Sequence, residues 1–379
     1  MNLLSVIANL MHYPILLDNV FTDTIKYLLS PETLLNGVVI LVLGIVLVVS
    51  TVYLYLFNKK INFVYTNRIR KHLETWISQI IMEEAPDGMV ISNKFHNLLN
   101  NRVARQFTIN ELILCKKNFS GMVGKNVIEL YLQLGLKQYS LQKLKSKKWY
   151  IQARGIQELY QMDQHDMLEE ISRYTNSKNE FVRMEAQTGL IHLSGADGLN
   201  FLDDITYPIT EWQQLKLLEQ LRLYPDKKDL SEKMPAWLSS SNATVVIFAL
   251  KLASEYQLFS VKKEVVNCLV HPQSDVRSQA IKALTSLSDE KTSLILLGYF
   301  NKEEPENQLH ILDSMRSLAT EEDVPGLVQL LDHENNMIKL KAAMILADVT
   351  PKGLDILERK GMEQPEPYQR IYRHVKTIR

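Results

Sequence analysis

Hydrophobic positions fill one stretch near the beginning of the chain and recur at helical spacing after it. No charged residue occurs between Glu32 and Lys59, and the residues from Leu34 to Phe57 are almost all apolar. A helix rises about 1.5 Å per residue, so this stretch is long enough to cross a hydrocarbon core of about 30 Å. Buried helices of soluble proteins are usually shorter and amphipathic. The pattern therefore predicts one transmembrane helix over residues 34–57.

Charges on either side of the predicted span indicate its direction. Five bases follow it before the first acid, and they are Lys59, Lys60, Arg68, Arg70 and Lys71. Residues 1–33 contain one base, Lys26, and form a predicted short extracytoplasmic or interfacial segment. Because basic flanks stay in the cytoplasm, we expect a single-pass protein of the plasma (inner) membrane, with its N-terminus outside. A cleaved signal peptide fits poorly, since it begins with a basic region.

The residues after the span are predicted to form helices that lead into a second region. Apolar residues at helical spacing continue the span inward to about Glu84, where Ala85-Pro-Asp-Gly88 ends the helix. The next predicted helices run near Ser92 to Gln106, from a capping box at Thr108-Ile-Asn-Glu111, and roughly from Gly124 to Leu136. We interpret residues 58–146 as a basic juxtamembrane helical neck with an N-terminal solenoid cap.

An apolar residue recurs beyond Lys147 at intervals of 29–33 residues, a period typical of stacked helical hairpins. The recurring positions are Ile151, Val182, Trp212, Val245, Val276, Leu309 and Ile338. Four residues after most of them stands a small residue: Gly155, Ala186, Ala249, Ala280 or Ala342. Lys216 and Asp313 break this rule, so the third and sixth units are predicted to be degenerate.

These units resemble HEAT repeats of the short bacterial type. The clearest copy is His271-Pro-Gln-Ser-Asp-Val-Arg-Ser-Gln-Ala-Ile-Lys-Ala-Leu284, and residues 179–186 and 335–342 repeat its frame. The resemblance implies an all-α fold, a right-handed armadillo-type α-solenoid of about six or seven hairpins. It would cover residues 147–350, and a capping helix over 351–379 would close its end.

Three bases occupy equivalent positions directly after a recurring apolar residue: Arg183, Arg277 and Lys339. The resemblance implies that they join a ladder of polar contacts between repeats, with Asp275 suited to pair with Arg277. The other interpretation is a basic stripe that binds an acidic partner.

The chain is neutral overall, with 43 Lys and Arg against 43 Asp and Glu, but its bases are clustered. No acid occurs from Leu130 to Gln157, where the densest basic run consists of Lys137, Lys143, Lys145, Lys147, Lys148 and Arg154. This run is the candidate binding site for anionic lipid or an acidic partner, and it would tilt the first repeats onto the membrane. A solvated face is the equal alternative. Nucleic acid is not expected, because aromatic residues are sparse around the run.

Motifs for chemistry are weak. Cys115 and Cys268 stand far apart, and no His/Cys spacing typical of a metal site occurs. Gly121-Met-Val-Gly124-Lys125 lacks the spacing of a phosphate-binding loop and favours a helix start. We therefore expect no catalytic residues, no metal, no cofactor, no small-molecule substrate and no enzyme activity.

The combined pattern predicts a membrane-tethered cytoplasmic scaffold or adaptor that docks a protein partner at the membrane. Bacterial proteins with one N-terminal span and HEAT-like repeats resemble accessory subunits of envelope assemblies, which implies a partner such as a polysaccharide glycosyltransferase. Two alternatives stay open. One is a HEAT-like lyase or isomerase that attaches bilin chromophores, and the other is a transmembrane signal relay.

Overall fold

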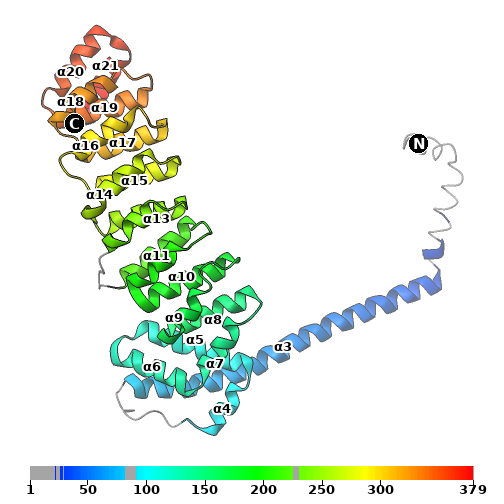
Figure 1. The fold of residues 1–379 in the computed structure, drawn as a ribbon. Coiled ribbons are helices and arrows are strands. Elements are labelled where there is room, and N and C mark those ends of the chain that lie inside the picture. Colours follow the sequence, from blue (N-terminus) through cyan, green and yellow to red (C-terminus); the bar gives the residue numbers. More distant parts are fainter. Residues whose placement is uncertain (1–21, 23–25, 29, 82–90, 225–229, 379) are drawn as a thin grey trace, which may run out of the picture. The chain divides into compact units, whose positions relative to one another are not determined.

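A computed structural model of the chain describes residues 22, 26–28, 30–81, 91–224 and 230–378 (Figure 1). These residues form helices and connecting turns, without a strand, so the predicted all-α fold is confirmed for them. The chain divides into two compact units, residues 1–134 and 135–379. Most of the predicted N-terminal segment, residues 1–33, lies outside the described residues, as does the predicted stop at Ala85-Pro-Asp-Gly88.

The N-terminal unit is built on one unbroken helix, α3 (Pro31–Ile81). The Ser30 hydroxyl accepts a hydrogen bond from the Thr33 N–H at 3.3 Å, and Pro31 follows at the first helical position. The predicted span and the predicted juxtamembrane helix are therefore a single helix. Its C-terminal part packs against α4 (Asn93–Leu99), α5 (Arg102–Asn118) and α6 (Gly121–Gln133).

The core of this unit follows a helical spacing on α3. Ile69, Leu73, Trp76 and Ile80 are buried, and the Trp76 and Phe95 rings meet edge to face with centroids 4.5 Å apart. Leu112 of α5 and Val127 of α6 are buried in the same unit. This half of α3 is thus packed into a core, whereas the half before it is exposed.

The predicted helix start at Thr108 is wrong. Thr108 lies inside α5, where its hydroxyl donates to the Ala104 carbonyl oxygen at 3.0 Å. The helix begins after Asn101, whose side-chain oxygen accepts hydrogen bonds from the Val103 and Ala104 N–H groups at 2.9 and 3.1 Å. An Asn cap already satisfies the first turn, so the later Thr-x-x-Glu spacing has no helix end to cap. The start of α6 at Gly121 confirms the helix-start interpretation of the glycine pair.

The C-terminal unit stacks eight helical hairpins within its described residues (Figure 1). Their first elements are α7 (Leu136–Leu144), α9 (Leu168–Ser172), η2 (Gly195–Asp203), α12 (Met234–Leu238), α14 (Lys262–Asn267), α16 (Thr292–Phe300), α18 (Val324–Leu330) and α20 (Gly353–Glu363). Their second elements are α8 (Trp149–Gln161), α10 (Glu180–Ser194), α11 (Glu211–Arg222), α13 (Ala243–Glu255), α15 (Ser274–Ser286), α17 (Pro305–Leu318), α19 (Asn336–Val349) and α21 (Pro365–Ile378). Short 3₁₀ turns η1 (His165–Met167), η3 (Leu230–Glu232), η4 (Phe259–Val261), η5 (Cys268–Val270) and η6 (Glu321–Asp323) flank several first elements.

The register of the repeat is more regular than the sequence suggested. The second helices from α8 to α19 begin every 31 or 32 residues, at 149, 180, 211, 243, 274, 305 and 336. The third helical residue is the recurring position, and in the third and sixth units it is Gln213 and Asn307. Both side chains are buried, whereas Trp212 is 63% exposed. The assignment of Trp212 and Leu309 to this position is therefore wrong. Four residues after Gln213 and Asn307 stand Leu217 and Ile311, so these two units still lack the small residue of the others.

Hydrogen bonds explain how a polar residue occupies this position. The Gln213 side-chain oxygen accepts from the Thr210 N–H at 2.9 Å, which closes a capping box. The Asn307 amide donates to Glu303 Oε2 at 2.8 Å and to the Ser274 carbonyl oxygen at 3.3 Å. Satisfied polar groups can be buried at small cost, so the backbone repeat continues through both units.

The last hairpin covers the end of the stack. The segment predicted as a capping helix contains two helices, α20 and α21, and the Tyr368 hydroxyl of α21 donates to the Leu331 carbonyl oxygen at 2.8 Å. Tyr368, Ile371 and Val375 are buried on one side of α21. The last hairpin thereby covers the apolar face of the preceding hairpin, which would otherwise be exposed to solvent.

Candidate functional site

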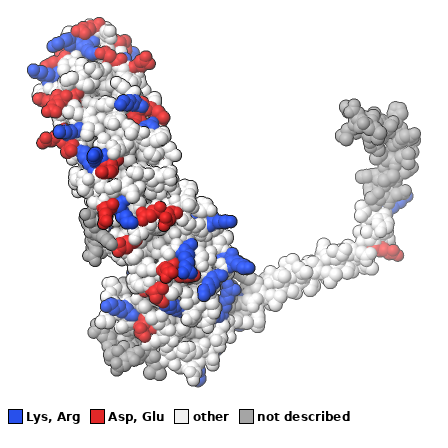
Figure 2. All heavy atoms as spheres, viewed as in Figure 1, with Lys and Arg blue, Asp and Glu red and all other residues white. Residues whose placement is uncertain are grey.

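The apolar part of α3 has no packing partner among the described residues. Every residue from Leu34 to Phe57 is exposed, and the most apolar window of the helix is 0% buried. Figure 2 shows this stretch without an acidic or basic side chain. The helix is long and apolar enough to cross a membrane, as a membrane span or a signal anchor.

The structure divides the predicted basic run into two groups. Lys137, Lys143 and Arg154 form ion pairs with acids of the first two hairpins. Lys137 Nζ lies 2.5 Å from Asp166 Oδ2. Lys143 Nζ lies 2.7 Å from Glu158 Oε2, and Arg154 Nε lies 3.4 Å from Glu158 Oε1.

Glu158 explains why these bases gather. Its side chain is 2% exposed, and besides the two bases it accepts a hydrogen bond from the Ser140 hydroxyl at 2.7 Å. A buried carboxylate needs such partners, because desolvation disfavours its charge. Lys143 of α7 therefore joins α7 to α8, whereas Arg154 pairs with Glu158 within α8, and the charges of both bases are largely neutralised.

The second group faces solvent. Lys145, Lys147 and Lys148 lie in the turn between α7 and α8 and are exposed. Among the described residues, no hydrogen bond or ion pair engages their ammonium groups. Of the six predicted residues, these three are the ones whose charge is available to a ligand.

Exposed aromatic rings follow these lysines directly, a feature that the sequence analysis missed. Trp149 and Tyr150 open α8, and their rings meet edge to face at 5.7 Å. Trp149 also stacks on Phe181 of α10, with centroids 5.0 Å apart and planes inclined by 22°. The signal was present, since Tyr150, Phe181 and Trp212 each directly precede the recurring third position of their helix.

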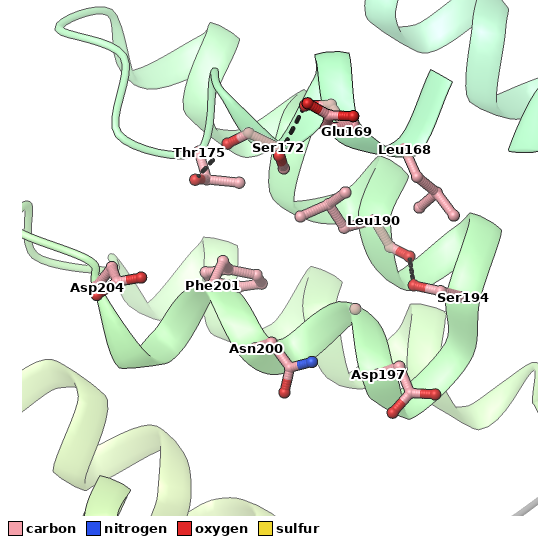
Figure 3. Close-up of a pocket in the computed structure, with 11 residues that line it drawn as sticks. Leu168, Glu169, Ser172, Thr175, Leu190, Ser194, Asp197, Asn200, Phe201 and Asp204 are labelled. Carbon is pink, nitrogen blue, oxygen red and sulfur yellow. Dashed lines mark hydrogen bonds between the residues drawn. The ribbon is translucent and has the colours of Figure 1, made fainter. Parts of the chain in front are cut away.

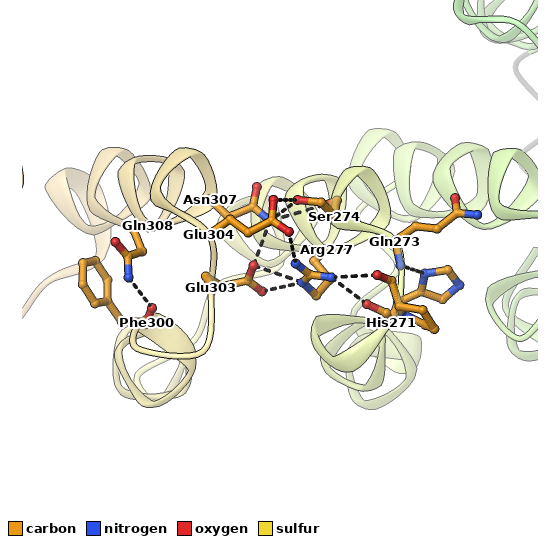
Figure 4. Close-up of polar contacts among 10 residues, drawn as sticks. His271, Gln273, Ser274, Arg277, Phe300, Glu303, Glu304, Asn307 and Gln308 are labelled. Atoms are coloured by element: carbon orange, nitrogen blue, oxygen red, sulfur yellow. Dashed lines mark hydrogen bonds and ion pairs between the residues drawn. The ribbon is translucent and has the colours of Figure 1, made fainter.

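The three bases at equivalent positions act between repeats, as the ladder interpretation predicts, and Figure 4 shows the contacts of Arg277. Arg277 of α15 donates from Nε to both carboxylate oxygens of Glu303 at 3.0 Å, and from a terminal nitrogen to the His271 carbonyl oxygen at 2.9 Å. The Arg183 guanidinium lies 4.2 Å from the Tyr207 ring centroid, and Lys339 Nζ lies 5.7 Å from that of Tyr368.

The partner of Arg277 differs from the expected one. Arg277 forms its ion pair with Glu303 of the following hairpin, and not with Asp275 of its own helix. Glu303 lies in the turn between α16 and α17 of the next repeat. The ion pair therefore joins two hairpins.

A pocket of ≈ 420 Å³ lies between α9, α10 and η2 (Figure 3). Glu169, Asp197 and Asp204 contribute carboxylates to its lining. Its hydroxyl groups are turned to local backbone: Ser172 donates to the Glu169 carbonyl oxygen and Ser194 to that of Leu190, both at 2.7 Å. The pocket is a gap between two repeats that favours cations over anions.

Ionisable side chains from three repeats meet at the C-terminal ends of α8, α10 and α11. His192 Nε2 lies 3.0 Å from Asp163 Oδ1, and Gln220 Nε2 lies 3.2 Å from His192 Nδ1. An imidazole with its proton on Nε2 satisfies both contacts. The Tyr160 hydroxyl donates to Glu185 at 2.8 Å, and burial, followed by the charge of Glu185, raises the pKa of Tyr160.

The two cysteines are free and buried. Burial raises the pKa of Cys268 to about 11 and also raises that of Cys115. Within the described ranges, no group of three or more His, Cys, Asp or Glu side chains could hold a metal ion.

Comparisons with known proteins give a fold likeness without a family. No protein-family model matches the sequence, and no curated protein matches it. Three solved structures illustrate the likeness.

An engineered protein is 15% identical, with 74% of this chain and 86% of that chain covered at a TM-score of 0.36. Human deoxyhypusine hydroxylase in complex with glycerol is 15% identical, with 74% and 96% covered at 0.27. The complex of CpcE and CpcF of phycocyanin lyase from Nostoc is 11% identical, with 72% and 95% covered at 0.25. At TM-scores this low, these likenesses place no residue and no activity on the present chain.

The comparisons nevertheless correct one expectation. The sequence analysis predicted that the chain is not an enzyme, because it found no catalytic motif. A hydroxylase and a lyase are among the similar structures, so that prediction is contradicted. A fold does not by itself decide between binding and catalysis.

Proposed function

We propose that this chain is a HEAT-type helical-repeat protein that α3 anchors in a membrane and whose solenoid docks a protein partner there. The observation that carries the proposal is the complete exposure of Leu34–Phe57 on a helix whose other half is packed. Burying a large apolar side chain gains about 1.5–3 kcal/mol relative to water. A stretch of this length therefore needs an apolar environment that the described chain does not supply.

The direction of the span rests on its flanks. Lys59, Lys60, Arg68 and Lys71 are exposed on α3 after the span, while Glu32 precedes it. Basic residues at one end keep that end in the cytoplasm. The proposal therefore places the N-terminus outside the plasma membrane and residues 58–379 in the cytoplasm.

The partner is proposed from the repeat architecture. Stacked hairpins present long surfaces that bind other macromolecules through many shallow contacts. A tether confines the solenoid and a membrane-bound partner to one surface and raises their effective concentration. An accessory role beside a membrane enzyme, such as a glycosyltransferase that makes exported polysaccharide, fits this geometry.

The membrane part is tested by placing charge inside the span. In the variant Leu43→Arg/Val46→Arg, each charge costs about 2.5–3.5 kcal/mol at a membrane centre. We expect the wild type to stay with membranes after alkaline carbonate extraction and the variant to lose its membrane fraction. The control Leu223→Arg/Met362→Arg changes two residues that are already exposed in the C-terminal unit. Equal extraction of all three proteins would refute the span.

The partner is tested by crosslinking in cells. The full-length protein is compared with a variant that lacks residues 1–57, and the captured proteins are identified by mass spectrometry. Capture of one soluble protein by both supports recognition by the solenoid. Capture of a membrane enzyme only by the full-length protein supports the accessory role. Capture of no specific protein by either would count against docking.

A second candidate function is enzymatic, of the HEAT-like lyase or isomerase type. The Asp163–His192 pair favours it, because a carboxylate that orients an imidazole is a common acid–base arrangement. The test incubates the detergent-solubilised full-length protein with a free bilin and an acceptor protein. Covalent transfer that is lost in His192→Asn and kept in His310→Asn would support the enzyme, and absence of transfer would exclude this reaction.

A further inference from the structure

The first three second helices of the C-terminal unit show exposed aromatic rings at one equivalent position. Tyr150, Phe181 and Trp212 each occupy the second helical residue and are 52%, 45% and 63% exposed. The same position holds Asp275 in α15 and Glu306 in α17. The rings therefore mark one end of the stack and are not a requirement of the repeat.

These rings lie on three neighbouring helices, α8, α10 and α11. Trp149 contacts both Tyr150 and Phe181, so three rings are held against one another. Trp212 lies on the adjacent helix α11, with Lys216 Nζ 5.7 Å from its ring centroid. Helices pack about 8–10 Å apart, so the row from Tyr150 to Trp212 extends about 20 Å.

Lysines accompany the rings. Lys145, Lys147 and Lys148 precede Trp149 in the turn, and Lys178 precedes Phe181, all of them exposed. Two exposed carboxylates also lie here, Glu180 and Glu211, at the first residues of α10 and α11. Bases outnumber acids two to one, and the three lysines of the first turn have no acid beside them.

We propose that this basic–aromatic edge, consisting of Lys145, Lys147, Lys148, Trp149, Tyr150, Phe181 and Trp212, lies on the anionic headgroup surface of the bilayer that α3 crosses. Tryptophan and tyrosine are the residues favoured at the membrane–water boundary. Lysines beside them attract anionic lipid. The inference rests on the proposed span, since α3 keeps the solenoid close to a bilayer.

The composition of the edge favours lipid over a protein partner. The centres of protein interfaces are enriched in aromatic residues and Arg and depleted in Lys. Here the four exposed bases that precede the rings are all Lys, and none of the edge residues lines the described pocket. A protein can bind a flat anionic lipid surface through exposed basic groups and aromatic rings, and it needs no cavity for this.

The test uses full-length protein in nanodiscs that contain brominated lipid, which quenches tryptophan at short range. The chain has four tryptophans, and Trp76 and Trp237 are buried. Trp76 lies about 28 Å along α3 from Phe57, at 1.5 Å per residue. We expect quenching in anionic nanodiscs to fall in Trp149→Phe and in Trp212→Phe, and to be weaker in zwitterionic nanodiscs.

A charge variant with a matched control sharpens the test. One lysine near an anionic surface raises affinity about fivefold, so Lys145→Gln/Lys147→Gln/Lys148→Gln lowers the docking equilibrium about a hundredfold. Lipid-dependent quenching should be lost in this variant. The control Lys263→Gln/Lys291→Gln/Lys352→Gln removes the same charge from three exposed lysines elsewhere in the C-terminal unit and should quench like the wild type.

The outcomes separate this inference from the proposed function. If the protein does not insert into nanodiscs, the span itself fails. If it inserts but Trp149 and Trp212 are not quenched, the edge does not contact lipid and the inference is refuted while the span stands. If quenching is absent and the edge variant also loses the protein captured in cells, the edge binds that protein instead.

Discussion

The ion pair between Arg277 and Glu303 allows a quantitative test of how the repeats hold together. Glu303 is 1% exposed at its side chain and Arg277 is 13% exposed. In the variant Arg277→Met, the Glu303 carboxylate stays buried and retains the Asn307 amide, 2.8 Å away, as a donor. Removing one partner of a buried pair costs about 3–5 kcal/mol, because the remaining charge is uncompensated.

The expected loss is local, since each hairpin contacts mainly its neighbours. Hydrogen exchange followed by mass spectrometry on the detergent-solubilised full-length protein measures this local loss of stability. A single global unfolding curve would instead average over several hairpins. A loss of about 3–5 kcal/mol lowers protection in α15 and α17 about a hundredfold or more. Protection in α8 and α10 should stay unchanged.

Two further variants test whether burial of the Glu303 charge causes the loss of protection in Arg277→Met. Arg173→Met removes two surface pairs about one helical turn away, with Glu169 and Glu170, each worth about 0.3–0.5 kcal/mol. Arg277→Met/Glu303→Leu removes both charges and should restore much of the protection, because no buried charge is left. The reasoning is refuted if Arg277→Met loses no more protection than Arg173→Met. It is also refuted if the double variant loses as much protection as the sum of the two single variants.

Three other predictions concern close packing, pH and thiol access. A Cβ at Gly353 would clash with the backbone of Leu346, so Gly353→Ala should cost about 1–3 kcal/mol by hydrogen exchange in α19 and α20. Gly298→Ala, with nothing within 4 Å of the added Cβ, should stabilise α16 by about 0.8–1 kcal/mol in the same measurement. Hydrogen bonds from Lys262 and Thr292 lower the pKa of Asp289 from 3.8 to about 2. The pair with Lys262 therefore stabilises the fold above pH 4 and is lost as the pH falls from 4 to 2, so the stability difference between wild type and Asp289→Asn should vanish over that range; a constant difference would contradict it. Cys268, buried and with its pKa raised to about 11, should react with a maleimide at pH 7 only as fast as the hairpin opens, and fast labelling of the native protein would disprove its burial.

The sequence predicted those parts of the fold that depend on a pattern of apolar residues. The span needs only an uninterrupted apolar run, and the period of the hairpins needs only Val182, Val245, Val276 and Ile338, which are fully buried. The register failed where Gln213 and Asn307 replace an apolar residue. Their burial depends on hydrogen bonds to Thr210 and to Glu303, and no periodicity of hydrophobic residues records such partners.

The candidate site was predicted in part for a similar reason. A run of bases in sequence says nothing about the acids that packing brings to it. Asp166 reaches Lys137 from 29 residues away, and Glu158 reaches Lys143 from 15. The aromatic half of the edge was readable in principle, from rings that recur every 31 residues, once the correct starts of the helices were known.

The unbroken course of α3 has a mechanical consequence. Its 51 residues make a rod about 76 Å long at 1.5 Å per residue. The backbone hydrogen-bond ladder is continuous, and Ile69, Leu73, Trp76 and Ile80 on the same rod are buried against α4, α5 and α6. An axial displacement of the apolar end is therefore transmitted along the helix to that core. A displacement of one helical turn would move those four side chains by about 5.4 Å and require the core to repack.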